Sequence, residues 1–137
     1  MKKVVLILVA FVAMATNLMA DSWVQKATNP NMGTGMDASF SIGNKGYCFQ
    51  RNTLGDMWEY NQVTDSWTQK ATFTDTAWNN TPLGFAIGGI GYILFQDYGT
   101  LYAFNPVANI WETKTTYSLT TIWSVVFAVG NKAVFGT

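Results

Sequence analysis

From residue 38 onward, short segments of this chain alternate apolar and polar residues, and clusters of turn residues separate the segments. Tyr47 and Phe49 lie two residues apart in one such segment, and Trp58 and Tyr60 do so in another. This period of two is typical of β-strands, whose side chains point alternately to the two faces of a sheet. Beyond the first twenty residues no segment has the apolar stripe of a helix, so the pattern predicts an all-β protein.

The predicted strands fall into groups of four that follow one another along the chain. The first group comprises Ala38–Gly43, Gly46–Gln50, Met57–Asn61 and Ser66–Ala71, and the second comprises Leu83–Gly88, Gly91–Gln96, Leu101–Asn105 and Ile110–Thr115. We expect a lone strand before them, Trp23–Ala27, and the first two strands of a third group after them, Ile122–Val129 and Lys132–Phe135. Between two of the strands, Gly88-Gly89 suits the positive φ angles of a hairpin turn.

Three tryptophans, Trp23, Trp67 and Trp111, recur 44 residues apart, and each opens a near-copy of one phrase. The three phrases read Trp-Val-Gln-Lys-Ala-Thr, Trp-Thr-Gln-Lys-Ala-Thr and Trp-Glu-Thr-Lys-Thr-Thr. A second phrase recurs from Phe40 and Phe85 at a slightly different offset, as a loop of variable length would produce. A repeat this long marks a unit that buries its apolar face only by stacking on its neighbours. We therefore expect the three tryptophans to pack between successive units.

The 44-residue unit resembles the kelch repeat, in which four antiparallel strands form one blade of a β-propeller. The matching segments are Phe40–Tyr47, Trp58–Asn61 and Thr64–Ala71, and they are most similar to secreted bacterial kelch proteins with galactose-oxidase-like propeller blades. The resemblance covers the chain from Trp23 to its last residue. It implies a partial kelch propeller over residues 21–137: a lone fourth strand, two full blades at about 38–71 and 83–115, and half of a third at about 122–137.

Two departures from the kelch pattern affect what the resemblance implies near the ring axis. The family's arginine before the first strand is missing, and Gly35 and Asn80 lie in the corresponding region. The glycine pair after the second-strand tyrosine is replaced by Cys48-Phe49-Gln50 in the first unit.

The chain is far too short for a whole ring, because kelch rings resemble propellers of six or seven blades and each blade takes 44 residues. Three interpretations therefore stay open. The chain is a fragment of a longer ring, it self-associates to complete a ring, or it is a short stack with exposed apolar faces.

The first twenty residues have the pattern of a secretory signal peptide. Lys2 and Lys3 precede a continuous apolar run, Val4–Ala15, and a short stretch ending at Ala20 follows. The run is shorter than the ~20 residues that a membrane-spanning helix needs. We therefore expect residues 1–20 to be removed, with cleavage after Ala15 or Ala20 left open. The mature protein would then be secreted, periplasmic or at the cell surface, with no membrane span.

Composition and charge exclude several function classes. Without Lys2 and Lys3, the eight basic residues fall to six against eight acidic ones, a net charge of about −2. No basic patch is evident, so nucleic acid is a poor partner. The chain has no histidine, which removes Ser-His-Asp and Cys-His catalysis and most transition-metal sites, and it has no calcium loop or phosphate-binding glycine loop. We expect no catalytic residue, metal or cofactor, and we expect the single cysteine, Cys48, to be a buried apolar residue.

Candidate binding residues lie in the longer and more variable loops. In an antiparallel sheet the loops after the second and the fourth strand lie at the same end, and binding residues concentrate on such loops. The candidates that we expect to line a ligand site are Trp78, Asn79, Asn80, Arg51, Asp97 and Tyr98. Trp78 interrupts the 44-residue register, and a ring beside two amides can stack on a sugar or peptide while bonding its polar edge. The alternative is that Trp78 packs against a neighbouring unit.

Two functions remain open at this point. The first is a non-catalytic binding module that presents its loops to a protein or a glycan. The second is a sugar-modifying enzyme, because some secreted kelch propellers resemble sialic-acid epimerases. The missing arginines and histidines favour the binding module over the enzyme, whereas the identity of the ligand stays open.

Overall fold

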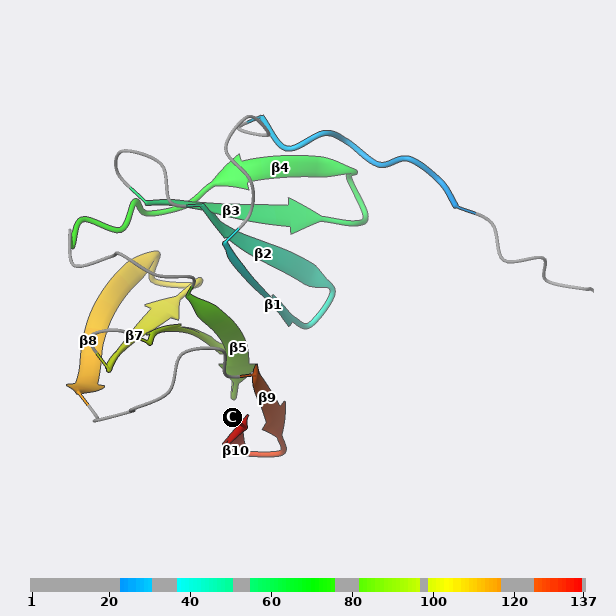
Figure 1. Ribbon diagram of the computed structural model, residues 1–137. Helices are drawn as coiled ribbons and strands as arrows, with labels where there is room; N and C mark the ends of the chain where they lie inside the picture. The colour runs from blue at the N-terminus through cyan, green and yellow to red at the C-terminus, as the bar shows by residue number, and fades with distance from the viewer. Residues whose placement is uncertain are drawn as a thin grey trace, which may run out of the picture.

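The computed structural model describes residues 23–30, 37–50, 55–75, 82–96, 99–116 and 125–136. Within them the chain forms ten β-strands and no helix (Figure 1). The strands are β1 Ala38–Ile42, β2 Lys45–Gln50, β3 Asp56–Asn61, β4 Ser66–Gln69, β5 Leu83–Ile87, β6 Ile90–Phe95, β7 Thr100–Asn105, β8 Ile110–Thr116, β9 Val125–Val129 and β10 Lys132–Gly136. The all-β prediction is confirmed for these residues, and the start of the expected strand at 122–129 lies outside them.

Eight of these strands form two four-stranded antiparallel sheets. The first sheet has the order β1-β2-β3-β4 and the second has the order β5-β6-β7-β8, so neighbours in sequence are neighbours in space. β9 and β10 form an antiparallel hairpin. The turn after the first strand of each group contains Gly43, Gly88 or Gly130, with φ of 59°, 59° and 60°. Glycine adopts this left-handed conformation at no steric cost, which is why the chain reverses there.

The two sheets and the hairpin stack through their first strands. β1 packs against β5 and β5 packs against β9, so these three strands lie side by side (Figure 1). Glycine permits the close approach. A Cβ on Gly84 would lie 2.6 Å from the carbonyl oxygen of Ser39, and a Cβ on Gly91 would lie 2.1 Å from the ring of Phe40. Both distances are far below van der Waals contact. A larger residue at position 84 would therefore push β1 and β5 apart, and one at position 91 of β6 would displace the ring of Phe40.

An aromatic core fills the space between the two sheets. Phe49 of β2 is fully buried and meets Phe73, Phe95 and Trp111 edge-on, with ring centroids 5.8, 5.9 and 6.0 Å away. This is the arrangement that aromatic pairs prefer, because the electropositive edge of one ring meets the electronegative face of another. Cys48 is buried as expected, and burial raises the pKa of its thiol.

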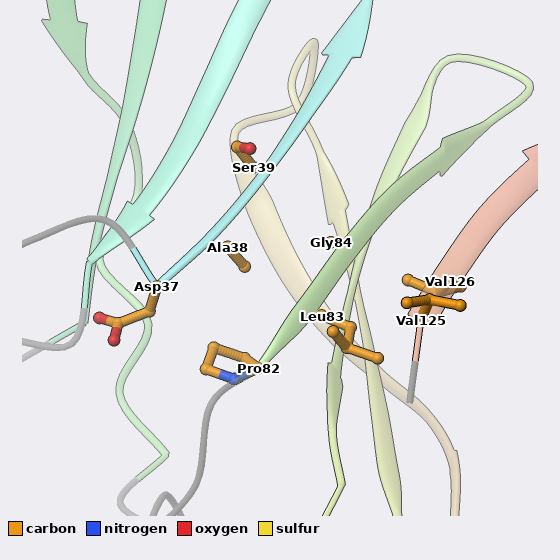
Figure 2. A pocket seen from close by; sticks show the side chains of 8 residues that line it. All are labelled: Asp37, Ala38, Ser39, Pro82, Leu83, Gly84, Val125 and Val126. Carbon is orange, nitrogen blue, oxygen red and sulfur yellow. The ribbon is translucent and has the colours of Figure 1, made fainter. Parts of the chain in front are cut away.

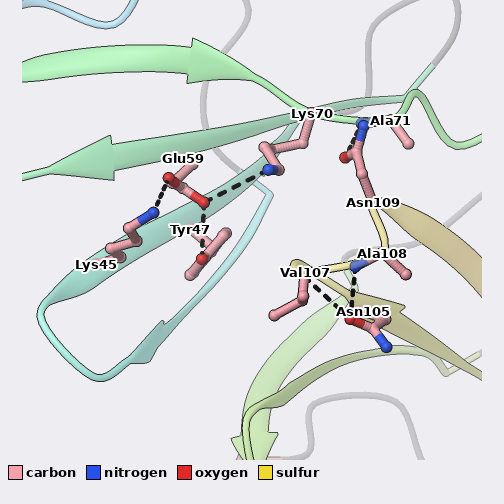
Figure 3. A network of polar contacts seen from close by, with 9 residues as sticks. All are labelled: Lys45, Tyr47, Glu59, Lys70, Ala71, Asn105, Val107, Ala108 and Asn109. Atoms are coloured by element: carbon pink, nitrogen blue, oxygen red, sulfur yellow. Dashed lines mark hydrogen bonds and ion pairs between the residues drawn. The ribbon is translucent and has the colours of Figure 1, made fainter.

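A pair of hydrogen bonds that recurs after 44 residues explains two of the periodic tryptophans. Trp67 Nε1 donates to the carbonyl oxygen of Ala27 over 2.7 Å, and Asp65 Oδ1 accepts from the N–H of Ala27 over 3.0 Å. In the second copy, Trp111 Nε1 donates to the Ala71 carbonyl oxygen over 2.8 Å. Asn109 Oδ1 accepts from the Ala71 N–H, also over 2.8 Å (Figure 3). We call each pair a Trp–Asx clamp, and each clamp ties a sheet to the segment that precedes it.

The prediction of a lone strand at Trp23–Ala27 is wrong, since residues 23–29 form no strand. The physical reason is the lack of a partner strand. β4 pairs with β3 along its length, whereas the hydrogen bonds of the clamp hold the segment 23–29 at Ala27. Trp23 is 99% exposed. The expected packing of the periodic tryptophans therefore holds for Trp67 and Trp111, which are half-buried, and not for Trp23.

Candidate functional site

The six residues predicted to line a ligand site all lie outside the described residues. They are Arg51, Trp78, Asn79, Asn80, Asp97 and Tyr98. The described residues on either side of these three loops are Gln50 and Gly55, Asp75 and Pro82, and Gln96 and Gly99. The structure therefore locates the bases of the predicted loops.

These loop bases lie at one end of the sheets, which we call the loop end. Antiparallel pairing sets Gln50 opposite Asp56 and Phe95 opposite Thr100, so β2 and β6 end where β3 and β7 begin. The tight turns after β1, β3, β5 and β7 lie at the opposite end, which we call the turn end. The longer connections therefore lie at the loop end, and the tight turns lie at the turn end.

A cavity of about 330 Å³ opens at the loop end between the three first strands, and we call it the axial cavity. Its lining residues are Asp37, Ala38, Ser39, Pro82, Leu83, Gly84, Val125 and Val126 (Figure 2). They come from the beginnings of β1, β5 and β9, and Leu83 lies between the β1 residues and the two valines. The N–H of Asp37 donates to the carbonyl oxygen of Phe49 over 3.0 Å, which fixes the entry to β1 against β2. Most of the wall is apolar, with Asp37 and Ser39 as its polar side chains.

A second cavity of about 280 Å³ lies at the outer edge of the second sheet, and we call it the rim cavity. Its lining residues are Phe73, Thr74, Asp75, Tyr102, Trp111, Glu112 and Thr113. The segment after β4 forms one wall, and β7 and β8 form the other. The N–H of Phe73 donates to the carbonyl oxygen of Gly55 over 2.8 Å, so the first wall is anchored to the base of a predicted binding loop.

Aromatic contacts and one hydrogen bond order the rim cavity. The ring of Phe73 is buried and lies 4.7 Å from the ring of Tyr102 and 5.1 Å from that of Trp111, measured between centroids. The Tyr102 hydroxyl donates to Asp75 Oδ2. Burial, the hydrogen bond to Asp75 and its negative charge raise the pKa of Tyr102 far above its usual range, so the phenol stays a donor at neutral pH.

Sequence reasoning missed a buried ionic cluster around Glu59 in the first sheet. Lys45 Nζ lies 2.5 Å from Glu59 Oε1, the Tyr47 hydroxyl donates to Oε2 over 2.8 Å, and Lys70 Nζ lies 3.7 Å from Oε2 (Figure 3). Burial alone would raise the pKa of Glu59, but the two hydrogen bonds and the lysine charges outweigh it and hold that pKa below its usual range. The cross-strand register that pairs Tyr47 with Glu59 is the signal that could have revealed the cluster.

The Glu59 cluster is suited to holding strands together. A carboxylate kept charged by two lysines and a tyrosine is a weak proton acceptor, so it is poorly suited to general-base chemistry. Burial, the hydrogen bond to Glu59 and its charge raise the pKa of Tyr47 as well, which keeps this phenol protonated. The cluster lies on the face of the first sheet that packs against the second, where the rings of Tyr47 and Phe104 are 6.2 Å apart.

In the described ranges, no group of three or more acidic, cysteine or histidine side chains could hold a metal ion. The same ranges contain no helix of the length and apolarity that crossing a bilayer requires. Compared with known proteins, the chain matches no protein-family model and no curated protein.

Proposed function

We propose that this chain is a secreted, non-catalytic binding module of the kelch-propeller kind that holds a protein or glycan ligand at its loop end. The observation that carries the proposal is the presence of both cavities, axial and rim, beside the loop bases. Ligand sites in proteins are concave, largely apolar and marked by a few polar groups, and the axial cavity fits that description. The rim cavity combines aromatic rings with a larger share of polar side chains. Variable loops on a constant scaffold are also where binding residues concentrate.

The proposal includes the blade architecture. In a propeller the first strands of successive blades surround a central axis, and the contacts of β1 with β5 and of β5 with β9 support such an arrangement. The Trp–Asx clamp at Ala27 and again at Ala71 supports it too, because it joins successive units in the same way. On this view each four-stranded sheet is one blade and the hairpin β9–β10 is the first half of another.

The ionisable groups favour binding over sugar-modifying catalysis. Glu59 is held as a carboxylate by hydrogen bonds from Lys45 and Tyr47 and by the charge of Lys70. The raised pKa values of Tyr47 and Tyr102 keep both phenols protonated. General acid–base catalysis needs groups whose pKa lies near the working pH. Glu59, Tyr47 and Tyr102 are therefore suited to fixing structure through hydrogen bonds rather than to acid–base catalysis.

The predicted ligand residues fit this proposal through their neighbours in sequence. Trp78, Asn79 and Asn80 follow Asp75 of the rim cavity and precede Pro82 of the axial cavity. A ligand seated in either cavity would therefore be within reach of this loop. An aromatic ring with two amides can stack on the ligand and hydrogen-bond to it, whether the ligand is a sugar or a peptide.

The test is retention of the mature protein on glycan and peptide arrays. A variant with Trp78, Asn79 and Asn80 replaced by alanine should lose retention and keep the circular dichroism of a β-sheet protein. The matched control replaces Gln62 and Val107, which are exposed at the turn end, and should keep retention. Asn61 and Asn105 are unsuitable controls, because their side chains accept backbone N–H bonds that hold their turns. Loss in the control with retention in the loop variant would contradict the proposal.

A further inference from the structure

The rim cavity combines aromatic rings with negative charge. Three of the seven side chains that line it are aromatic and two are carboxylates, whereas none of them is basic. The nearby Lys70 and Lys114 form ion pairs, with Glu59 over 3.7 Å and with Glu112 over 2.5 Å. The pair with Glu112 is exposed, and exposed pairs of this kind are weak and exchange readily with other partners.

The side-chain N–H and O–H donors of the aromatic wall are already used. The indole N–H of Trp111 donates to the Ala71 carbonyl, and the hydroxyl of Tyr102 donates to Asp75. What the wall offers a ligand is therefore ring surface, and most of it belongs to half-buried Trp111, because Phe73 and Tyr102 are buried. The carboxylates add acceptors, since each ionised carboxylate has about four lone-pair sites. A cavity of ring faces and acceptors selects a ligand group that brings donors and positive charge.

The first unit shows that the fold does not require this negative charge. Counting back 44 residues, Asp75 corresponds to Asn31 and Glu112 corresponds to Thr68. Two of the three aromatic positions remain aromatic, with Trp58 in place of Tyr102 and Trp67 in place of Trp111, whereas Phe73 corresponds to Asn29. The unit thus forms with neutral residues at both positions, and the two acids belong to the second unit alone.

We infer that the rim cavity receives the cationic side chain, arginine or lysine, of a protein partner. The guanidinium or ammonium group would lie against the aromatic wall and donate to Asp75 and Glu112. This inference rests on the proposed binding function and narrows its ligand class from protein or glycan to a protein segment with an exposed basic residue. A neutral sugar fits the cavity less well, because its hydroxyls need acceptors and donors in similar number.

The test is a titration of the mature protein with small probes. Binding is measured from the nuclear magnetic resonance signal of the Trp111 indole N–H. The probes are N-acetyl-arginine amide, the corresponding lysine compound, the neutral isostere N-acetyl-citrulline amide, and methyl galactoside. We expect the cationic probes to shift this signal and saturate, and the citrulline probe to bind at least roughly tenfold more weakly, as a lost charge-assisted hydrogen bond implies.

The decisive variant is Asp75→Asn, compared with Asp65→Asn. Both changes raise the net charge by one. Both also leave an oxygen that can accept the existing hydrogen bonds, from Tyr102 at position 75 and from Ala27 and Tyr60 at position 65. Asparagine already serves at position 109, the counterpart of Asp65, so the control should fold normally. We expect Asp75→Asn to weaken binding of the arginine probe roughly tenfold and Asp65→Asn to leave it unchanged.

Equal binding of the arginine and citrulline probes would overturn the inference, and so would equal weakening by the two variants. Saturation by methyl galactoside with no response to either cation would overturn it as well. These results would leave the proposed function intact as long as the Trp78, Asn79 and Asn80 variant still loses array retention. Conversely, a saturable arginine response with no array retention by the unmodified protein would count against the proposed function alone.

Discussion

Single residues in this protein owe their roles to their surroundings rather than to their type. Trp111 and Trp23 occupy equivalent positions of the repeat, yet one packs against the core and the other is 99% exposed. Glu59 and Ala103 likewise occupy equivalent positions of the repeat. Because Ala103 has no carboxylate, the ionic cluster forms around Glu59 in the first unit. The repeat thus gives a residue its place in the sequence pattern, and its neighbours in space decide whether it is buried and what it contributes.

The contrast between the two tryptophans predicts a stability difference. Trp111→Ala removes contacts with Phe49, Phe73 and Phe104 and the clamp bond to Ala71, so it should cost about 3–5 kcal/mol of unfolding free energy. Trp23→Ala should change that free energy by no more than about 0.5 kcal/mol. Chemical denaturation of both variants measures the difference, and equal losses would show that the core has been wrongly located.

The Glu59 cluster predicts how stability depends on pH. The pKa of Glu59 is lower in the folded than in the unfolded chain, so its contribution is full above the unfolded value of about 4.3 and is lost as pH falls through the folded value. Glu59→Gln should lower stability at pH 7 and reduce the difference between pH 7 and pH 3. Thermal melts across this range test the prediction. An unchanged pH profile in the variant would mean that Glu59 contributes nothing to acid sensitivity.

At the scale of strands and sheets, the alternating pattern was sufficient to predict most elements, because each strand keeps the same neighbours along the chain. The exception is instructive. Trp23–Ala27 and Trp67–Ala71 differ at a single position, Val24 against Thr68, yet only the second forms a strand. Pairing with β3 makes the difference, and no local pattern contains that information.

The candidate site was predictable only in its general position. The turn residues and loop lengths indicated which end of the sheets would hold long loops. The rim cavity, however, depends on Phe73, Tyr102 and Trp111 meeting in space, although they come from three different segments. The partners of Glu59 similarly depend on strand register, so sequence spacing alone revealed neither feature.

The close approach of the first strands predicts different effects of two glycine substitutions. Gly84→Ala places a Cβ against the backbone of Ser39, which cannot move aside as a side chain can, so we expect a loss of about 1–3 kcal/mol. Gly46→Ala is the control, because the nearest atom to its Cβ is 3.9 Å away. This variant should be neutral or more stable by up to about 1 kcal/mol, since alanine restricts the unfolded chain. Denaturant midpoints in the reverse order would contradict the stacking of β1 on β5.

At the scale of the whole molecule, half of the ten large apolar side chains that are exposed among the described residues lie on the hairpin β9–β10. Val125, Phe127, Val129, Val134 and Phe135 are each more than two-fifths exposed. Apolar patches of this kind mark contact surfaces in soluble proteins. Self-association remains one of the interpretations that the sequence left open, and light scattering over a range of concentrations would measure it.

Export is a prediction about the whole chain. The basic start and the short apolar run should direct the protein out of the cytoplasm, and the mature chain should begin between Thr16 and Asp21. Mass spectrometry of the N-terminal peptide from secreted material measures this directly. A soluble cytoplasmic protein that keeps Met1 would contradict the prediction.

The central claim is that this protein binds its ligand at the loop end, and hydrogen exchange with and without an array-selected ligand tests it most directly. The account predicts slower exchange in peptides that span residues 71–82 and 96–100, beside the two cavities. Peptides that span 61–66 and 105–110 at the turn end should exchange at unchanged rates. Protection confined to the turn-end peptides would contradict the account, because the ligand would then occupy the opposite end of the sheets.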